Sequence, residues 1–283
     1  MRLRFLCHLF MVLTVICTNA VCFADNNAAA TIRWAYQGQR GPTNWGRLDP
    51  SFKKCSTGKN QSPIHITGRI KPTSKKLVIN YIPAPLNLIN DGATRLQIGH
   101  EYVLINDGHT VQANFPIDIE EVLELAGERY RMLQFHFHMP SENKLQNASY
   151  PLELHFVHQG LNGKIAVLAV FAKVGPPNLE LQSLVDHLPK TKGVQHVIPG
   201  KSIDPLNLLP KQTSFYSFVG SLTTPPCSER VLWIVLRNPI TLSADQLARI
   251  KNAINANNAR PLQPLNHRSI ETGRHITIVN PGL

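Results

Sequence analysis

Residues 133–160 read LQFHFHMPSENKLQNASYPLELHFVHQG, and this stretch is the most informative about the fold. Two apolar-rich runs, 131–138 and 151–159, flank a polar loop that contains strand-breaking residues. Runs of this length, separated by such a loop, are typical of neighbouring strands in a sheet. The stretch therefore predicts a pair of strands that places the side chains of one run against those of the other.

Three histidines of this stretch are candidate metal ligands. Because side chains alternate along a strand, His136 and His138 leave the same face of the first run. His155 in the second run can face them across the ladder, whereas His158 points to the opposite face, where we expect a structural role. Three protein nitrogens and a fourth position for water are typical of catalytic zinc. A single strand histidine is usually a hydrogen-bonded core or edge residue, so the residues alone leave both interpretations open.

The motifs of this chain resemble those of the alpha class of carbonic anhydrases. QFHFH, SEN and ELHFVH are similar to the zinc core of that family, and further matches are WAYQG, GPTNW, NQSPIHI, NDGH, SLTTPPC, VLWIVL and RPLQPLNHR. The resemblance implies an enzyme in which zinc-bound hydroxide reversibly hydrates carbon dioxide to bicarbonate and a proton. It also implies that Zn²⁺ is the cofactor and that His136, His138 and His155 hold it.

The resemblance assigns catalytic roles to three further residues. Thr223 in SLTTPP is expected to accept a hydrogen bond from the hydroxide and to donate its own to Glu142 in PSEN. This arrangement needs an ionised carboxylate, because a protonated one cannot hold the hydroxyl group in that sense. His109 in NDGHT matches the family's proton shuttle, and the ordinary pKa of histidine suits that task near pH 7. From the residues alone, His109 is equally well a turn histidine.

The family pattern also implies partners around the ligands and a wall for the substrate. The partners expected to fix the ligand rings are Gln134, Glu153 and the main-chain carbonyl of Asn258. Tyr36 is expected at the cavity floor near the hydroxyl relay. The residues implied to line the substrate pocket, which would otherwise be ordinary core or turn residues, are Val157, Val167, Leu222, Thr224, Val231 and Trp233.

Two other functions stay open at this point. A catalytically silent relative would be a binding module, but such relatives lack a ligand histidine, and here all three are present together with Thr223, Glu142 and His109. A zinc esterase would share the same site. The chain departs from the family pattern at Asn143, where many members have another histidine, and at Ala259, where some have tryptophan. We expect both to affect local stability more than activity.

The N-terminus has the composition of a secretory signal peptide. Two arginines precede an apolar run, and small residues precede a polar start. We expect cleavage after Ala24, with Ala20 as the second choice, so that 1–24 is the signal peptide and 25–283 is one catalytic domain. No basic stop-transfer cluster follows, which argues against a membrane anchor. The mature protein is therefore expected to lack a membrane span and to be exported to the periplasm or the extracellular space.

Cysteine usage fits export. Removal of the signal peptide leaves only Cys55 and Cys227, an even pair that is a candidate disulfide in an exported protein. Exported members of the family join cysteines at matching places. The alternative is two unpaired thiols, which we do not expect outside the cytosol.

The formal net charge of the chain is +11, but its lysines and arginines are scattered. No long basic run or basic helix is present, so we expect a solvated basic surface and no nucleic-acid partner. The expected partner is the small-molecule substrate pair of carbon dioxide and bicarbonate. Both a monomer and a homodimer are compatible with the sequence.

The remaining pattern predicts a sheet-dominated single domain with a few peripheral helices. Short apolar runs alternate with turn residues at 77–81, 86–89, 96–98, 102–105 and 110–115. Longer runs at 165–174 and 231–236 fit buried strands. Helices are expected from Asn178 and after the capping box that starts at Ser243. The resemblance implies a large twisted, mostly antiparallel central β-sheet with the metal at the base of a cone-shaped cavity.

Overall fold

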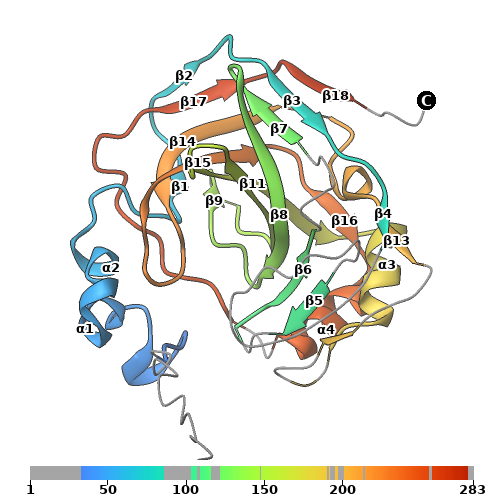
Figure 1. Cartoon of the computed structure of the whole chain (residues 1–283), viewed down its shortest axis with the longest axis horizontal. Coiled ribbons are helices and arrows are strands. Elements are labelled where there is room, and N and C mark those ends of the chain that lie inside the picture. The colour runs from blue at the N-terminus through green and yellow to red at the C-terminus, as the bar shows by residue number, and fades with distance from the viewer. Residues whose placement is uncertain are drawn as a thin grey trace, which may run out of the picture. The chain divides into compact units, whose positions relative to one another are not determined.

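One large, curled β-sheet runs through the part of the chain that the structure describes (Figure 1). The computed structural model describes residues 33–85, 103–106, 109–115, 122–146, 148–189, 191, 195–196, 201–212, 214–254 and 257–279. The strands are β1 (His65–Ile66), β2 (Ile70–Pro72), β3 (Leu77–Asn80), β4 (Ala84–Pro85), β5 (Val103–Asn106), β6 (Val111–Asn114), β7 (Val122–Leu125), β8 (Glu128–His138), β9 (Lys144–Leu145), β10 (Leu152–Gly160), β11 (Ile165–Val174), β12 (Gln195–His196), β13 (Ser202–Ile203), β14 (Phe215–Ser221), β15 (Glu229–Leu236), β16 (Ile240–Leu242), β17 (Ile270–Gly273) and β18 (Ile276–Val279).

The helices are short and few. They are α1 (Trp45–Leu48), α2 (Lys54–Thr57), α3 (Leu179–Asp186) and α4 (Ala244–Ala253), with 3₁₀ turns η1 (Gly38–Arg40), η2 (Pro50–Phe52) and η3 (Pro205–Leu208). Within the described ranges, no helix is long and apolar enough to cross a membrane.

The sheet is mixed, with antiparallel pairs in the majority as the resemblance implied. The path of paired strands is β12-β5-β6-β8-β10-β11-β15-β14-β17-β2, and a branch from β8 continues through β7 and β3 to β18. The pairs β11–β15, β11–β16, β17–β2 and β18–β3 are parallel. The long strands β8, β10 and β11 lie side by side at the centre of this path, so the quoted stretch and its successor form the middle of the sheet.

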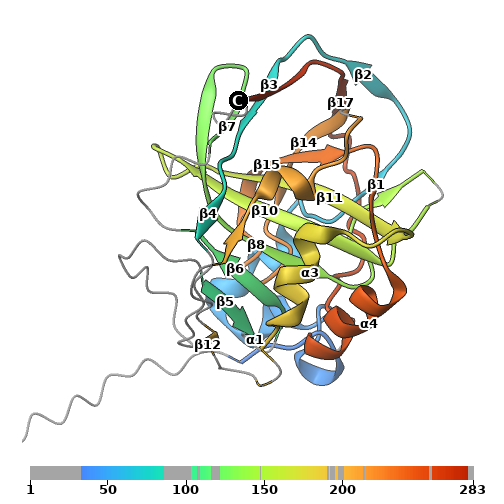
Figure 2. The same cartoon turned by 90° about the vertical axis from the view of Figure 1, so that its right-hand side faces the viewer.

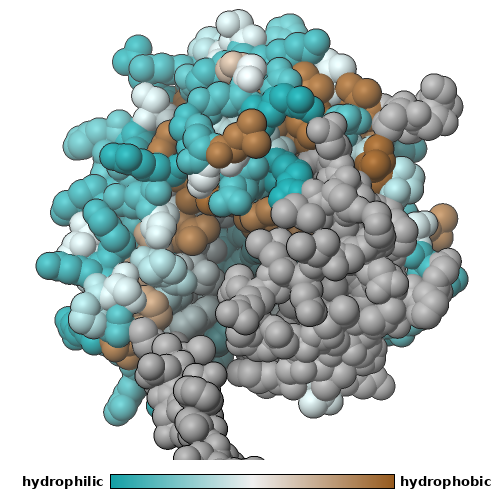
Figure 3. Space-filling model, in the orientation of Figure 1, coloured by the Kyte–Doolittle hydropathy of each residue, from teal (hydrophilic) through white to brown (hydrophobic). Residues whose placement is uncertain are grey.

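Both faces of the central strands are buried. Alternate residues of β11 pack into different apolar clusters: Leu168 and Val170 belong to one, and Val167 and Phe171 belong to the other. The nearly continuous apolar run at 165–174 therefore forms a strand that is covered on both sides, as predicted. The surface is more polar: in the view of Figure 3, most of the coloured residues are hydrophilic, with smaller hydrophobic groups scattered among them.

The two predicted longer helices form where their caps indicated. The Asn178 side chain accepts a hydrogen bond from the backbone N–H of Leu181, and Ser243 forms a reciprocal capping box with Gln246. The buried Gln246 amide also donates to the Asn178 carbonyl at 2.7 Å, which joins the start of α4 to the start of α3 (Figure 2).

Most predicted strands are present, and others were missed. Strands match the runs at 77–81, 102–105, 110–115, 165–174 and 231–236, whereas 86–89 and 96–98 lie outside the described residues. The sequence did not predict β14, in which serines and a glycine interrupt the apolar residues, or β17 and β18, which are short strands near the end of the described chain.

His158 lies on the face opposite the three candidate ligands, as predicted, and is fully buried. Its Nε2 lies 2.8 Å from the Tyr81 hydroxyl, and burial lowers the pKa of His158 from 6.5 to about 3. In the unfolded chain His158 is protonated as the pH falls through about 6.5, whereas in the folded chain it stays neutral down to about pH 3. The effect of His158 on the free energy of unfolding is therefore constant above pH 6.5, and stability is lost progressively as the pH falls toward 3. At pH 5 the loss amounts to about 2 kcal/mol.

We therefore expect His158→Gln, which cannot titrate, to flatten the pH dependence of unfolding. Urea unfolding at pH 7.5 and pH 5 should show a drop in the parent's free energy of unfolding that is about 2 kcal/mol larger than the drop in the variant. The exposed His275→Gln is the matched control and should behave like the parent. Equal drops in His158→Gln and the parent would contradict the prediction.

Candidate metal centre

The strand register brings the three candidate ligands together. On the paired strands β8 and β10, His136 lies directly opposite His155. His138, two residues further along β8, extends from the same face. One nitrogen from each ring lies within 4.8 Å of the other two, and the Nε2 atoms of His136 and His138 are 3.0 Å apart. The predicted convergence of three imidazoles is therefore present.

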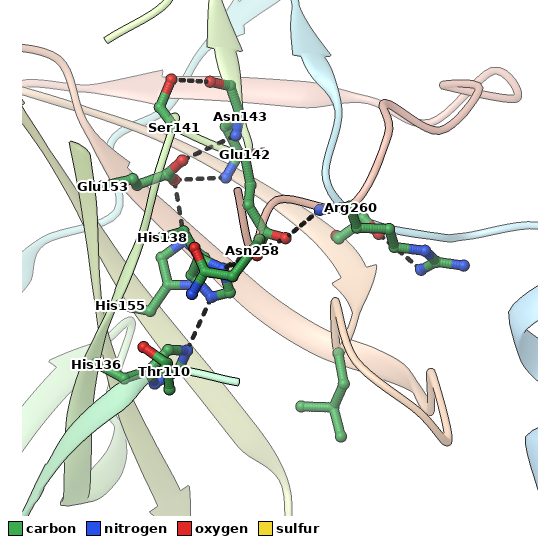
Figure 4. Close-up of polar contacts among 12 residues, drawn as sticks. Thr110, His136, His138, Ser141, Glu142, Asn143, Glu153, His155, Asn258 and Arg260 are labelled. Carbon is green, nitrogen blue, oxygen red and sulfur yellow. Dashed lines mark hydrogen bonds and ion pairs between the residues drawn. The ribbon is translucent and has the colours of Figure 1, made fainter. Parts of the chain in front are cut away.

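The other nitrogen of each ring faces an oxygen atom, which helps to orient the ring. Figure 4 shows this for His138 and His155. The distances are 2.7 Å from His136 Nδ1 to Gln134 Oε1, 2.8 Å from His138 Nδ1 to the Asn258 carbonyl and 3.1 Å from His155 Nε2 to Glu153 Oε1. The structure thus places all three expected partners beside their rings. The atoms left to face a metal ion are Nε2 of His136 and His138 and Nδ1 of His155.

This donor set fits Zn²⁺. Tetrahedral zinc with Zn–N bonds of about 2.0–2.1 Å requires nitrogen atoms about 3.3 Å apart. The Nε2 atoms of His136 and His138 are 3.0 Å apart, and all three nitrogen atoms lie within 4.8 Å of one another. Burial lowers the pKa of His136 and of His155 well below the ordinary value, so both rings are neutral near pH 7 and keep a free lone pair. Three imidazoles are a ligand set typical of catalytic zinc.

Glu142 lies beside the rings of His138 and His155 as a second buried carboxylate. Its Oε1 accepts a hydrogen bond from the Arg260 backbone N–H at 2.8 Å, and its Oε2 lies 3.9 Å from His155 Nδ1. Burial raises the pKa of Glu142 well above the ordinary value, whereas the Arg260 N–H, the Thr223 hydroxyl and the Arg260 charge lower it. A divalent cation beside the carboxylate would also lower the pKa of Glu142 and so oppose the effect of burial. The predicted pair of Thr223 and Glu142 is thus brought together, although Oε2 makes no hydrogen bond of standard geometry.

The residues expected to form the substrate wall lie in one apolar cluster beside His155. The cluster contains Val167, Val231 and Trp233, with Val157 and Leu222 packed against it. The Trp233 ring lies edge-on to the ring of His155, with centroids 4.9 Å apart. Thr224 is half-buried beside Thr223 in the loop between β14 and β15. An apolar surface therefore adjoins the three imidazoles.

His109 lies in an aromatic cluster next to this site. Its ring stacks on Trp34 with centroids 3.7 Å apart, and Tyr36 lies edge-on to both at 6.2 Å from His109 and 5.3 Å from Trp34. The His109 carbonyl accepts a hydrogen bond from the Asn258 side chain at 2.9 Å. Because the carbonyl of the same asparagine holds His138, the half-buried His109 is tied to the backbone that supports the metal ligands.

The predicted disulfide between Cys55 and Cys227 is present. It attaches the loop that carries Thr223 to the segment around Cys55. The buried Arg260 guanidinium donates to the Cys55 carbonyl at 3.0 Å and to Gln61 Oε1 at 2.9 Å, and the Gln61 amide donates to the Cys227 carbonyl at 3.1 Å. Sequence reasoning missed Arg260 and Gln61. Both lie in quoted motifs, RPLQPLNHR and NQSPIHI, but neither residue had been given a role from the sequence.

Comparison with known proteins agrees with this geometry. Residues 40–274 match the family described as eukaryotic-type carbonic anhydrase. A carbonic anhydrase of Neisseria gonorrhoeae is 37% identical over 94% of this chain and 97% of its own length. The solved structure of a Photobacterium profundum alpha-carbonic anhydrase is 39% identical, covers 84% of this chain and 100% of that one, and superposes with a TM-score of 0.73. The chain therefore belongs to the alpha, or eukaryotic-type, carbonic anhydrase family.

Proposed function

We propose that this carbonic anhydrase hydrates carbon dioxide at the site formed by His136, His138 and His155. The observation that supports this most strongly is the convergence of three imidazoles, each with an oxygen atom facing its other ring nitrogen, beside an apolar wall. Zinc at such a site lowers the pKa of a bound water to about 7, the value established for carbonic anhydrases as a class. The protein's own residues then orient the reacting water, bind carbon dioxide and remove the proton.

Thr223 is the orienting residue in this proposal. Its hydroxyl lies close enough to Glu142 to affect the pKa of that carboxyl group. In the proposal the hydroxyl donates to the Glu142 carboxylate during catalysis and therefore presents an oxygen lone pair, not a hydrogen, to the reacting water. The Thr223 backbone N–H is the group proposed to stabilise negative charge that develops on the substrate. Glu142 is kept in place by the Arg260 backbone N–H, which fixes the acceptor that this orientation needs.

Carbon dioxide is small and apolar, so it is expected to lodge against the apolar wall. The buried Val167, Val231 and Trp233 form the base of that wall, and the half-buried Val157 and Leu222 complete it. Bicarbonate is charged and gains nothing from this surface, so the same wall favours its release into water.

His109 is the proposed proton shuttle. Its half-buried ring is held flat against Trp34, and histidine exchanges protons readily near neutral pH. His109→Ala should lower turnover about tenfold or more in weak buffer, where proton export limits the rate, and added imidazole should restore it.

Stopped-flow hydration at several buffer strengths measures this effect. The exposed His275→Ala is the control and should match the parent at every buffer strength. A His109→Ala variant that is as fast as the parent in weak buffer would remove the shuttle role.

We further propose that the protein is exported to the periplasm or the extracellular space, with a signal peptide at 1–24 and a catalytic domain at 25–283. The predicted signal peptide lies outside the described residues. The disulfide between Cys55 and Cys227 supports export, because such bonds persist mainly in oxidising compartments. The monomer or homodimer expected from the sequence stays a prediction.

Stopped-flow carbon dioxide hydration and zinc analysis on the same purified sample test the proposed function. We expect about one zinc ion per chain and hydration that depends on it. A silent binding module would show no hydration. A zinc esterase would turn over esters much faster than it hydrates carbon dioxide, and either result would contradict the proposal.

A further inference from the structure

Asn143 is a buried polar residue for which sequence reasoning found no catalytic role. It follows β8 in the loop that leads to β9, and it is 1% exposed. Both ends of its side-chain amide are engaged: Oδ1 accepts from the Ile64 backbone N–H at 3.1 Å, and Nδ2 donates to Glu153 Oε1 at 2.7 Å. The Asn143 backbone N–H donates to the other oxygen of Glu153 at 2.8 Å (Figure 4).

This arrangement fixes which way the amide of Asn143 points. Ile64 supplies a donor and therefore needs the amide oxygen, whereas Glu153 supplies acceptors and needs the NH₂ group. A flipped amide would place two donors together and two acceptors together. Asn143 thus connects the backbone ahead of β1 to the carboxylate that faces His155.

The two hydrogen bonds from Asn143 hold both oxygens of a carboxylate that cannot turn toward solvent, since Glu153 is 0% exposed. Glu153 Oε1 is also the atom 3.1 Å from His155 Nε2. The contact is close without having the geometry of a standard hydrogen bond. A carboxylate oxygen fixed at this distance attracts the ring N–H, so the position of Glu153 constrains the His155 ring and the direction in which its Nδ1 points.

We propose that Asn143 is a positioning residue of the metal centre, which holds Glu153 against His155 and thereby slows the loss of zinc. The inference rests on the proposed function, because it needs a metal ion held by His155. Residues that orient metal ligands through a hydrogen bond typically change metal affinity 10–100-fold when they are replaced. Asn143 acts through one such residue, so an effect at the lower end of this range is expected.

The test measures zinc release from the zinc-loaded full chain into an excess of a colorimetric chelator. Asn143→Leu keeps the approximate size of the side chain and removes the two hydrogen bonds of the side-chain amide, to Glu153 Oε1 and from the Ile64 N–H, while the backbone N–H can still hold Glu153 Oε2. Zinc release should be about tenfold faster than in the parent. If Asn143→Leu does not fold, Asn143→Ala removes the same contacts with less crowding and should show the same acceleration.

Ser141→Ala is the matched control. The Ser141 hydroxyl lies in the same loop, accepts from the Tyr150 backbone N–H at 3.0 Å and donates to the Asn143 backbone carbonyl at 3.2 Å, but no hydrogen bond joins it to Glu153 in the described part of the chain. This variant loosens the loop while leaving Glu153 held, so its zinc release should match that of the parent. Equal release rates in the Asn143 variants and Ser141→Ala would overturn the inference.

A double-mutant cycle shows whether Asn143 acts through Glu153. In a Glu153→Ala background there is no carboxylate to hold, so Asn143→Leu should add less than a twofold acceleration. A full tenfold effect in that background would overturn the proposed route. If the parent chain binds no zinc, the proposed function fails first and this inference fails with it.

Discussion

Replacing His136 by alanine is expected to abolish zinc binding and carbon dioxide hydration together. The ring of His136 lies opposite His155 on the neighbouring strand, and its Nε2 is 3.0 Å from that of His138. Two imidazoles cannot complete a catalytic zinc site that needs three protein ligands. Zinc analysis should fall from about one ion per chain to a small fraction, and the hydration rate should fall by several orders of magnitude.

The control for this variant is His187→Ala, which removes the half-buried histidine that follows the last turn of α3 and whose Nδ1 faces the Ser183 carbonyl. It should retain zinc and activity. Near-parental hydration by His136→Ala would show that this ring is not a ligand, whatever the similarity of the surrounding motif.

Thr223→Val is expected to separate zinc binding from catalysis. Valine keeps the shape of threonine and removes the hydroxyl that acts on Glu142, so the metal site stays intact while the reacting water loses its orientation. Removing one such preorganised group typically lowers the rate about 100–1,000-fold. We expect a drop of about 100-fold in kcat/KM, measured by stopped-flow hydration, at unchanged zinc content.

Thr272→Val makes the same chemical deletion far from the site. The Thr272 hydroxyl donates to the Phe215 carbonyl at 3.1 Å, so its loss tests the general cost of removing a hydroxyl from the sheet. Activity should stay within about twofold of the parent. A Thr223→Val enzyme that keeps full activity would contradict the orienting role.

The metal ligands could be predicted from the sequence because strand periodicity determines where they point. The spacing of His136 and His138 places both rings on one face, and the neighbouring run supplies His155 directly opposite the first of them. The same alternation separated His158, which packs on the other face against Tyr81. Local pattern was sufficient here because the two strands are adjacent in the chain.

Features that depend on distant pairing could not be predicted in this way. β2 pairs with β17, so that Ile70 lies beside Ile270, and no local pattern in either segment specifies the other. Arg260 likewise donates hydrogen bonds to Gln61 and Cys55 through its side chain and to Glu142 through its backbone N–H, and all three partners lie far from it in the chain. The family motifs indicated that these segments matter, but only the structure shows what they contact.

Asn143 illustrates a different limit. From the sequence it was a departure from the family pattern, where many members have histidine, and was expected to affect local stability more than activity. The structure shows that this amide faces Glu153, so its effect reaches His155 through two successive contacts. Hydrogen bonds between side chains in a loop and a strand are set by packing and carry no periodic signal in the sequence.

The most direct test of the account is a zinc titration of the metal-free protein, followed by carbon dioxide hydration at each step. Activity should rise in proportion to added zinc and stop rising at one ion per chain, because one group of three imidazoles binds one ion. Full activity in the rigorously metal-free protein, or no activity after one equivalent of zinc has been bound, would contradict the central claim.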